Sequence, residues 1–534
     1  MRLNSVPIYL LFVIFTCFTI LEASNNGHGA RFSQDPIKRS DFPPGFLFGA
    51  ATSAYQIEGA YLEDGKSLSN WDVFCHSKGC GENGANGDVA DDHYHMFMFY
   101  IQEDIEMMHS LGIKAYRFSI SWARILPRGR FGEVNPLGVM FYNKVIDNLI
   151  IKGIEPFVTI HHEDFPQELE DRYESWLDPQ MQDDFVHFAE TCFKSFGDRV
   201  KYWITLNEPN LVAEMAYEKG RYPPNHCSQP FGNCLAGNSD LEPLFAMHNM
   251  LLAHGKAARL YREQFQSKQG GLIGLVANCF MYEPFSDSEL DRKAAERAMI
   301  FNTGWSFDPP IFGDYPQEMR EYLGNELPRF SAEEKDIMKN SIDFIGINHY
   351  SAMYAKDCTN SSCLESANRA ITGFVEKTGE RDGVLIGDPT AMPFYVVPRG
   401  MGEIVNYVKM RYNNTPMFVT ENGYSSPNVQ DVQVEEILND VKRIEFHQGY
   451  LASLAESISD GADVRGYFVW SLMDNYEWAF GYNVRFGLNY VDRETFDRIP
   501  KLSARWYQDF LKNSSLIDLA AITTPDSVHQ LADT

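Results

Sequence analysis

Two glutamates stand out for the chemistry that they could do together. Glu208 and Glu421 each follow an apolar stretch, in the segments 205–209 (TLNEP) and 419–423 (VTENG). Cleavage of a glycosidic bond uses two such carboxyl groups, one protonated to release the leaving oxygen and one ionised to attack or stabilise the oxocarbenium-like centre. A buried ion pair with Arg117 is the structural alternative for either glutamate.

Other polar and aromatic residues also stand at the ends of apolar runs. They are Gln56, Arg117, His162, Asn207, Asn348, Tyr350, Asn422 and Trp470. Any one of them could cap a loop or be a hydrogen-bonded polar residue of the core. Polar or aromatic residues at the ends of several such runs are, however, hard to obtain by chance. If the runs are parallel strands of one barrel, these side chains gather at its carboxyl end, where barrel enzymes hold their active sites.

The elements that must position these residues are eight short runs rich in apolar, β-branched or aromatic side chains. The runs are 46–56, 115–122, 155–162, 202–208, 272–279, 344–350, 417–423 and 467–472. Several are continuously apolar, as in strands covered on both faces, and helical patterns such as 429–460 separate them. The pattern predicts an α/β fold, a single (β/α)8 TIM barrel with long βα loops.

The segments around both glutamates resemble the two catalytic motifs of the glycoside hydrolase family 1 β-glucosidases. Two more segments, 48–59 (FGAATSAYQIEG) and 470–478 (WSLMDNYEW), match further motifs of that family. The resemblance runs from about residue 42 to residue 510, and the plant branch is the most similar. The resemblance implies the same barrel fold and a hydrolase that acts on β-glucosides.

The resemblance also implies a role for each site residue. Glu208 would be the general acid/base and Glu421 the nucleophile, held ionised and oriented by Arg117, Asn348 and Tyr350. An adjacent cation lowers the pKa of a carboxyl group and burial without one raises it, so two glutamates can play different parts at one pH. The residues expected to contact the sugar are Gln56, His162, Asn207, Tyr350, Trp470, Glu477, Trp478 and Phe486.

Three features narrow the expected substrate. A carboxylate at Glu477 would repel a phosphorylated sugar, and an intact Glu208 indicates an O-glycoside, because related thioglucosidases carry Gln there. The usual His-Trp-Asp of the family reads His162-Glu163-Asp164, so that Glu163 could accept the sugar hydrogen bond of the missing Trp or face a cation. This departure resembles a plant subgroup that hydrolyses monolignol glucosides such as coniferin and syringin, which predicts an aromatic aglycone.

The composition excludes several classes of partner. The net charge of −27 argues against binding to nucleic acid or to an anionic membrane surface and favours a neutral small molecule. A metal-like cluster, Asp88, Asp91, Asp92, His93 and His95, lacks the spacing that would place its members on one helix face, so no metal is expected. No nucleotide-binding motif is present, and no cofactor is expected.

The amino terminus resembles a secretory signal, with Arg2 followed by an apolar stretch too short for a membrane helix. We expect a signal peptide at 1–23, a flexible lead-in at 24–40, the barrel domain at 41–513 and a tail at 514–534. The mature chain is then expected outside the cell or in the cell wall, with the vacuole as the alternative.

Cysteines and glycosylation motifs fit an oxidising compartment. Cys227 and Cys234 close a short polar loop and are expected to form a disulfide. Cys358 with Cys363 and Cys75 with Cys80 are further local pairs, whereas Cys192 and Cys279 lie in apolar runs as expected free thiols. Asn360, Asn413 and Asn513 head Asn-x-Ser/Thr motifs for N-glycosylation.

Two other functions remain open from the sequence. A transglucosidase would use the same residues with an alcohol in place of water. A non-catalytic sugar-binding glycoprotein could share the scaffold, although such proteins lose a catalytic glutamate. The sequence does not decide between a monomer and a dimer.

Overall fold

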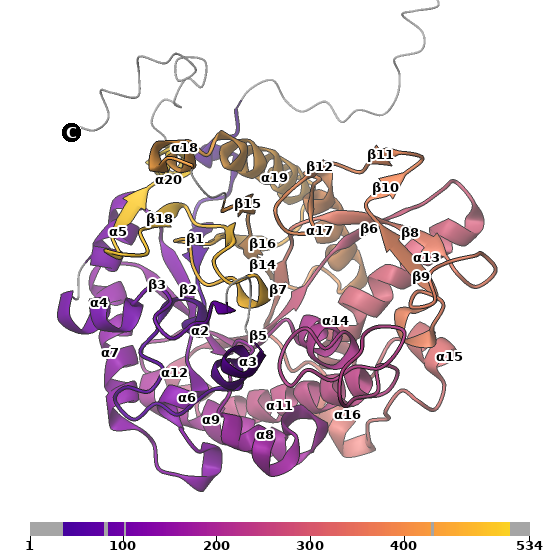
Figure 1. Cartoon of the computed structure of the whole chain (residues 1–534), viewed down its shortest axis with the longest axis horizontal. Coiled ribbons are helices and arrows are strands. Elements are labelled where there is room, and N and C mark those ends of the chain that lie inside the picture. Colours follow the sequence, from indigo (N-terminus) through magenta and orange to yellow (C-terminus); the bar gives the residue numbers. More distant parts are fainter. Residues whose placement is uncertain (1–35, 79–83, 101–102, 429–431, 513–534) are drawn as a thin grey trace, which may run out of the picture. The chain divides into compact units, whose positions relative to one another are not determined.

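The computed structural model describes residues 36–78, 84–100, 103–428 and 432–512. Eight parallel strands close into a barrel, each paired with the next along the ring, which confirms the predicted fold (Figure 1). The barrel strands are β1 (Leu47–Ala51), β2 (Ala115–Ser119), β3 (Glu155–His161), β4 (Tyr202–Asn207), β5 (Leu272–Asn278), β7 (Phe344–Asn348), β14 (Met417–Asn422) and β16 (Val464–Trp470).

Large aromatic side chains fill the barrel interior. Phe157, Phe344, Phe418 and Phe468 are buried in one cluster. The ring centroids of Phe157 and Phe468 are 4.8 Å apart, and those of Phe157 and Tyr202 are 4.1 Å apart. Side chains from different strands that meet in layers make a barrel a packed core and not a pore. The active-site residues must therefore lie above this layer, at the strand ends.

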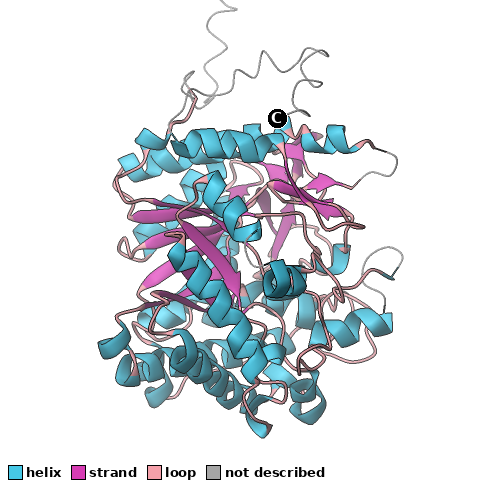
Figure 2. Cartoon of the chain, turned by 90° about the vertical axis from the view of Figure 1, so that its left-hand side faces the viewer, coloured by secondary structure: helices cyan, strands magenta, loops and turns pink. Residues whose placement is uncertain are grey.

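Helices surround the barrel and cover the outer faces of its strands (Figure 2). In α9 the buried positions include Phe185, Phe188, Cys192 and Phe196, which recur three and four residues apart as on one helix face. The helices of at least seven residues are α3 (Asn70–Lys78), α4 (His93–Tyr100), α5 (Glu103–Leu111), α7 (Pro136–Ile151), α8 (Gln167–Tyr173), α9 (Gln180–Phe196), α11 (Glu242–Gln264), α13 (Glu289–Met299), α14 (Trp305–Phe312), α15 (Gln317–Leu323), α16 (Ala332–Met338), α17 (Arg399–Arg411), α19 (Val441–Ser459) and α20 (Leu502–Lys512).

The helix predicted at 429–460 is two helices, α18 (Val434–Leu438) and α19, so this prediction was wrong in its first third. The break falls at Asp440, whose carboxylate accepts hydrogen bonds from the backbone and the hydroxyl of Ser503 at the start of α20. Asp440 also pairs with Arg443 in the next turn. A short polar side chain that hydrogen-bonds to backbone groups nearby is favoured at the start of a helix over its interior.

The long βα loops contain structure of their own. Strands β6 (Met281–Pro284), β8 (Ala352–Asp357) and β9 (Val375–Thr378) form a small sheet outside the barrel. The shorter elements elsewhere are α2 (Ala54–Ile57), α6 (Trp122–Ile125), α10 (Pro209–Val212), α12 (Gln266–Gln269), β10 (Glu380–Arg381), β11 (Val384–Leu385), β12 (Asp388–Pro389), β13 (Tyr395–Val396), β15 (Ser426–Pro427), β17 (Val484–Arg485), β18 (Asn489–Val491) and β19 (Arg498–Pro500).

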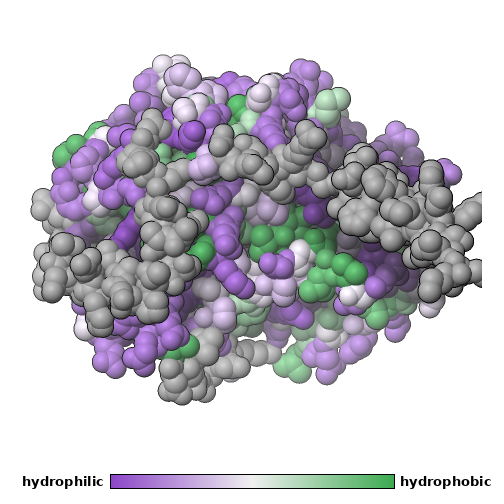
Figure 3. Space-filling view, turned by 90° about the horizontal axis from the view of Figure 1, so that it is seen from above, coloured by the Kyte–Doolittle hydropathy of each residue, from purple (hydrophilic) through white to green (hydrophobic). Residues whose placement is uncertain are grey.

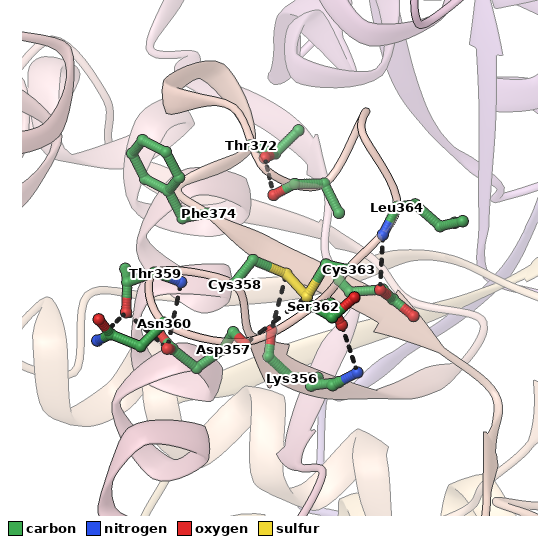
Figure 4. The surroundings of a disulfide bond; sticks show 12 residues. Lys356, Asp357, Cys358, Thr359, Asn360, Ser362, Cys363, Leu364, Thr372 and Phe374 are labelled. Carbon is green, nitrogen blue, oxygen red and sulfur yellow. Dashed lines mark hydrogen bonds between the residues drawn. A yellow bond between two sulfur atoms is a disulfide. The ribbon is translucent and has the colours of Figure 1, made fainter.

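Two of the predicted disulfides lie in these loops. Cys227 bonds to Cys234, and Cys358 bonds to Cys363 beside the exposed Asn360 (Figure 4). Cys75 is also disulfide-bonded, and its predicted partner lies outside the described residues.

The remaining cysteines and glycosylation motifs can be placed as well. Cys192 and Cys279 are buried free thiols, as predicted. Asn413, which heads the second motif, is exposed, and the third, Asn513, lies outside the described residues together with the predicted signal peptide and tail.

The start of the domain and its surface complete the fold. Arg39, which the sequence placed in the lead-in, belongs to a short helical turn (Arg39–Asp41), and its guanidinium lies 5.0 Å from the centroid of the Phe48 ring. The described helices include none that is long and apolar enough to cross a bilayer. Among the residues coloured in Figure 3, hydrophilic ones predominate and surround a hydrophobic patch near the centre of the view.

Candidate active site

Glu208 directly follows the irregular end of β4, and Glu421 lies in the irregular end of β14. The register between β4 and β5 shifts between Ile204 and Asn207, just before Glu208. The register between β14 and β7 shifts between Val419 and Glu421. Bulges of this kind bend a strand and re-aim its side chains, and they are frequent beside active sites. The φ angle of Glu208 is 47°, a left-handed value that is uncommon for a residue other than glycine.

Glu208 is a buried carboxyl group in a mostly neutral setting. Its Oε1 accepts hydrogen bonds from Nδ2 of Asn348 at 2.9 Å and from Nδ2 of Asn278 at 3.1 Å. Burial, followed by the charge of Glu421, raises the pKa of Glu208 to about 8. Because Oε1 already accepts two N–H groups, the proton of the neutral acid belongs on Oε2. Glu208 is therefore arranged as a proton donor at neutral pH.

Glu421 has a different environment, although it is equally buried. Its Oε1 is paired with the guanidinium of Arg117, which is itself inaccessible to solvent. Its Oε2 accepts a hydrogen bond from the hydroxyl of Tyr350 at 2.7 Å. A cation and a phenol that both hydrogen-bond a carboxylate stabilise its ionised form. Glu421 is therefore arranged as an oriented anion.

A continuous chain of hydrogen bonds joins the two glutamates. Asn348 donates from one amide nitrogen to Glu208 and to Oδ1 of Asn207, the latter at 3.1 Å. Arg117 donates to the same oxygen of Asn207 at 2.7 Å and, from its other terminal nitrogen, to Glu421. The chain fixes the side chains of four strands relative to one another.

A second group of polar residues lies across the same barrel end. Nε2 of Gln56 donates to the carboxylate of Glu477 at 3.2 Å and to the carbonyl of Tyr476 at 2.8 Å. Burial, followed by the charge of Glu421, raises the pKa of Glu477 to about 8. Nδ2 of Asn207 lies 3.1 Å from Nε2 of His162, so His162 accepts there and carries its proton on Nδ1, a buried atom with no hydrogen-bond partner in the described structure.

Aromatic rings border these polar groups. The ring of His162 stacks between Trp470 and Trp478, with centroid distances of 6.0 and 5.9 Å. Phe486 meets the ring of Tyr350 edge-on at 5.9 Å. All the sugar-binding residues predicted from the sequence thus lie in one connected cluster with the two glutamates.

Sequence analysis missed three members of the cluster. Asn278 ends β5, where a polar residue after an apolar run was the available signal. Phe394 stacks on Tyr350 at 5.4 Å and meets Phe280 at 5.6 Å, from a loop that carries no periodic pattern. Only the folded loops bring these two phenylalanines to the site.

Glu163, which replaces the tryptophan of the family, is surrounded by acids. The residue is 5% exposed, and burial and the charges of Glu208, Glu421 and Glu477 raise its pKa well above the ordinary value. The largest charge effects on the pKa of Glu163 come from other acids and none from a cation, which favours the sugar-binding alternative over the one in which Glu163 faces a cation. The shift favours the protonated form of this carboxyl group.

The acidic and histidine residues at 88–95 are tied into separate ion pairs. Asp91 pairs with Arg493, and His93 pairs with Asp104 at 2.8 Å. His95 hydrogen-bonds Asp92 at 2.6 Å. Their side chains hold the loop after β1 against other parts of the domain.

Comparisons with known proteins agree with this geometry. The model of the glycosyl hydrolase family 1 matches residues 38–516. The chain is 54% identical to a "Probable inactive beta-glucosidase 14" of Oryza sativa subsp. japonica (90% of this chain, 92% of the relative). It is 49% identical to a "Coniferin beta-glucosidase" of Pinus contorta (92% and 95%).

A solved structure is similar over the same region. A mutant of the rice β-glucosidase Os3BGlu6, in a covalent complex with Glc, has a TM-score of 0.85 and 46% identity and covers 89% of this chain and 99% of its own. A family model that spans most of the chain, relatives of matching length and a shared barrel lead to one conclusion. The chain belongs to glycosyl hydrolase family 1, a family of retaining glycosidases.

Proposed function

We propose that this protein is a β-glucosidase that hydrolyses O-linked β-D-glucosides with retention, by double displacement through a glycosyl-enzyme intermediate. The observation that carries the proposal is the contrast between the two linked glutamates. Glu421 is held as an anion by Arg117 and Tyr350, whereas burial holds Glu208 as a neutral acid. Glu421 would attack the anomeric carbon while Oε2 of Glu208 protonates the leaving oxygen, and Glu208 would then deprotonate the incoming water.

The remaining residues would bind the glucose ring. Asn207 uses one amide hydrogen toward His162 and has a second for the sugar 2-hydroxyl, a contact that strengthens in the transition state. His162 offers its unpartnered Nδ1 proton, and Gln56 and Glu477 offer a paired donor and acceptor. A carboxyl group at Glu477 would disfavour a phosphorylated sugar. Trp470 supplies an apolar surface for the ring.

The stereochemical test is proton NMR of the first sugar released from an aryl β-glucoside. Retention predicts that the β-anomer appears first and then mutarotates. An α-anomer as the first product would contradict the double displacement.

We further propose that the aglycone is aromatic, with a monolignol such as coniferyl alcohol as the first candidate. Support comes from the half-buried rings of Phe280 and Phe394, which extend from Tyr350 beside the nucleophile. Aromatic walls favour flat amphipathic ligands. The Pinus contorta relative is named for coniferin. Comparison of kcat/KM for coniferin, cellobiose and an alkyl glucoside tests the proposal, and a tenfold preference for cellobiose, about 1.4 kcal/mol in the transition state, would overturn it.

A non-catalytic role is the second candidate, because the rice relative at 54% identity carries the description "Probable inactive". Both catalytic-type glutamates are present in this chain, in the environments described above, which favours activity. Incubation with a nitrophenyl β-glucoside separates the two roles. Adding an alcohol acceptor and measuring the ratio of transfer product to free glucose tests transglucosylation.

We also propose that the mature protein is secreted to the cell wall, with the vacuole as the alternative destination. Support comes from the predicted signal, the disulfides at Cys227 and Cys358, and the exposed Asn360 and Asn413. Peptide mapping of native material without reduction, before and after glycosidase treatment, tests it. Free thiols at Cys227 and Cys234 in secreted material would contradict it.

A further inference from the structure

The Glu163 carboxyl group is an unpaired polar group in the interior of the site. Its Oε2 atom is buried and has no hydrogen-bond partner in the described structure. Most buried polar atoms in proteins are paired, because an unpaired one costs free energy. An exception beside reacting groups calls for a partner that arrives with the substrate.

The backbone at Glu163 is held in a strained conformation that presents this side chain. Its φ angle is 70°, in the left-handed region that favours glycine. Asn70 fixes the loop from both sides, since its Nδ2 donates to the carbonyl of Glu163 and its Oδ1 accepts from the amide of Phe165, both at 3.0 Å. Strain of this kind persists where surrounding contacts impose it, and it clusters at ligand sites.

The neighbours of Glu163 define what it could bind. The charges of Glu208, Glu421 and Glu477 raise its pKa from the end of β4, from β14 and from the loop after β16, and the charge of Asp164 does so from its own loop. It also borders a small cavity of about 10 Å³ together with Asn70, Trp71, His161, Phe165 and Tyr222. The nearby titratable groups are these four acids, the histidines His161 and His162, whose pKa values burial lowers, and the tyrosines Tyr217 and Tyr222. A second anion would be repelled, whereas a neutral hydroxyl would not.

We propose that the Glu163 carboxyl group hydrogen-bonds one ring hydroxyl of the bound sugar and is a glycone-selecting residue of this enzyme. The unpartnered Oε2 can accept a hydrogen bond from that hydroxyl in either protonation state, and when protonated the carboxyl group can also donate one. The inference deepens the proposed β-glucosidase function and rests on it. It assigns to the carboxyl group of Glu163 the sugar contact that the tryptophan of the family would make at this position.

The test measures whether substitution of Glu163 changes the effect of removing each sugar hydroxyl. The substrates are a nitrophenyl β-glucoside and analogues that each lack one ring hydroxyl, assayed with the wild type, Glu163→Ala and the matched control Glu163→Gln. Loss of the hydroxyl bound by Glu163 should lower kcat/KM about tenfold in the wild type and less than about threefold in Glu163→Ala. Glu163→Gln keeps an acceptor and carries a donor, so it should retain the coupling at the same hydroxyl that Glu163→Ala loses.

Three outcomes are distinct. Coupling at one hydroxyl supports the inference, whereas parallel losses for every analogue in the wild type and in Glu163→Ala would overturn it and leave Glu163 with a structural role. If the wild type turns over no glucoside, the proposed function fails. The coupling is then measured by tryptophan fluorescence as the binding of glucose and its deoxy analogues, and equal effects in all variants would overturn the inference.

Discussion

The substitution Glu208→Gln gives a direct test of the roles assigned to the two glutamates. Glutamine preserves the shape of the side chain, and its carbonyl can keep the hydrogen bonds that Oε1 accepts from Asn278 and Asn348. It removes the acidic proton on the other oxygen. We therefore expect a folded protein that has lost proton transfer and little else.

The size of the loss should depend on the leaving group. A positioned general acid contributes about 10²- to 10⁴-fold to rate, or about 2.7–5.5 kcal/mol. For coniferin or a phenyl glucoside, whose leaving oxygens need protonation, kcat/KM should fall by this amount in Glu208→Gln. For a dinitrophenyl glucoside, which leaves without assistance, kcat/KM should change less than about tenfold because this parameter reports the first step. The kcat should still fall, since water attack also uses Glu208.

The assay is steady-state kinetics on a series of aryl β-glucosides, with mass spectrometry of the trapped enzyme. Glu208→Gln should accumulate one glucosyl group on the peptide that contains Glu421. Glu421→Gln is the matched control, and it should lose turnover of every substrate without forming an adduct. Equal losses for activated and unactivated substrates in Glu208→Gln would refute the assignment of Glu208 as the acid.

Three further predictions follow from the same structure. Because protonated Glu208 is required and its pKa is raised to about 8, kcat/KM for coniferin should fall as pH rises through about 8, and a rate that still rises above pH 9 would contradict this. Arg117→Lys should lower kcat about 10- to 100-fold, because an ammonium group cannot hydrogen-bond both Glu421 and Asn207 as the planar guanidinium does. The melting temperature should stay within a few degrees of the wild type. An unchanged kcat would count against a role for the hydrogen bonds that Arg117 makes to these two residues. Removing the disulfide by Cys227→Ser should cost about 2.5 kcal/mol, read as a lower denaturant midpoint under non-reducing conditions, and no shift would mean that its short loop does not constrain the unfolded chain.

Local patterns in the chain were sufficient to predict the barrel strands. Runs such as 156–160 and 417–420 are almost wholly apolar, as is typical of a strand covered on both faces. The helix break at Asp440 could not be predicted in this way. The side chain of Asp440 hydrogen-bonds Ser503 in α20, more than sixty residues later in the chain, and the helix is interrupted there.

The sequence by itself indicated the two glutamates and the polar residues around them, because its motifs place Glu208 and Glu421 at strand ends and a parallel barrel brings all strand ends to one rim. It did not indicate Phe280 and Phe394, which folded loops bring to the site. Tertiary structure alone decided what each residue can do there. The pKa of Glu208 is raised by burial and by Glu421, and Glu421 is paired with Arg117, although these residues are far apart in the chain. The same holds for Glu163, whose pKa is raised by burial and then by the charges of Glu208, Glu421 and Glu477, all distant in the chain. Protonation depends on the dielectric surroundings and on the distance between charges, and these quantities exist only once the chain has folded.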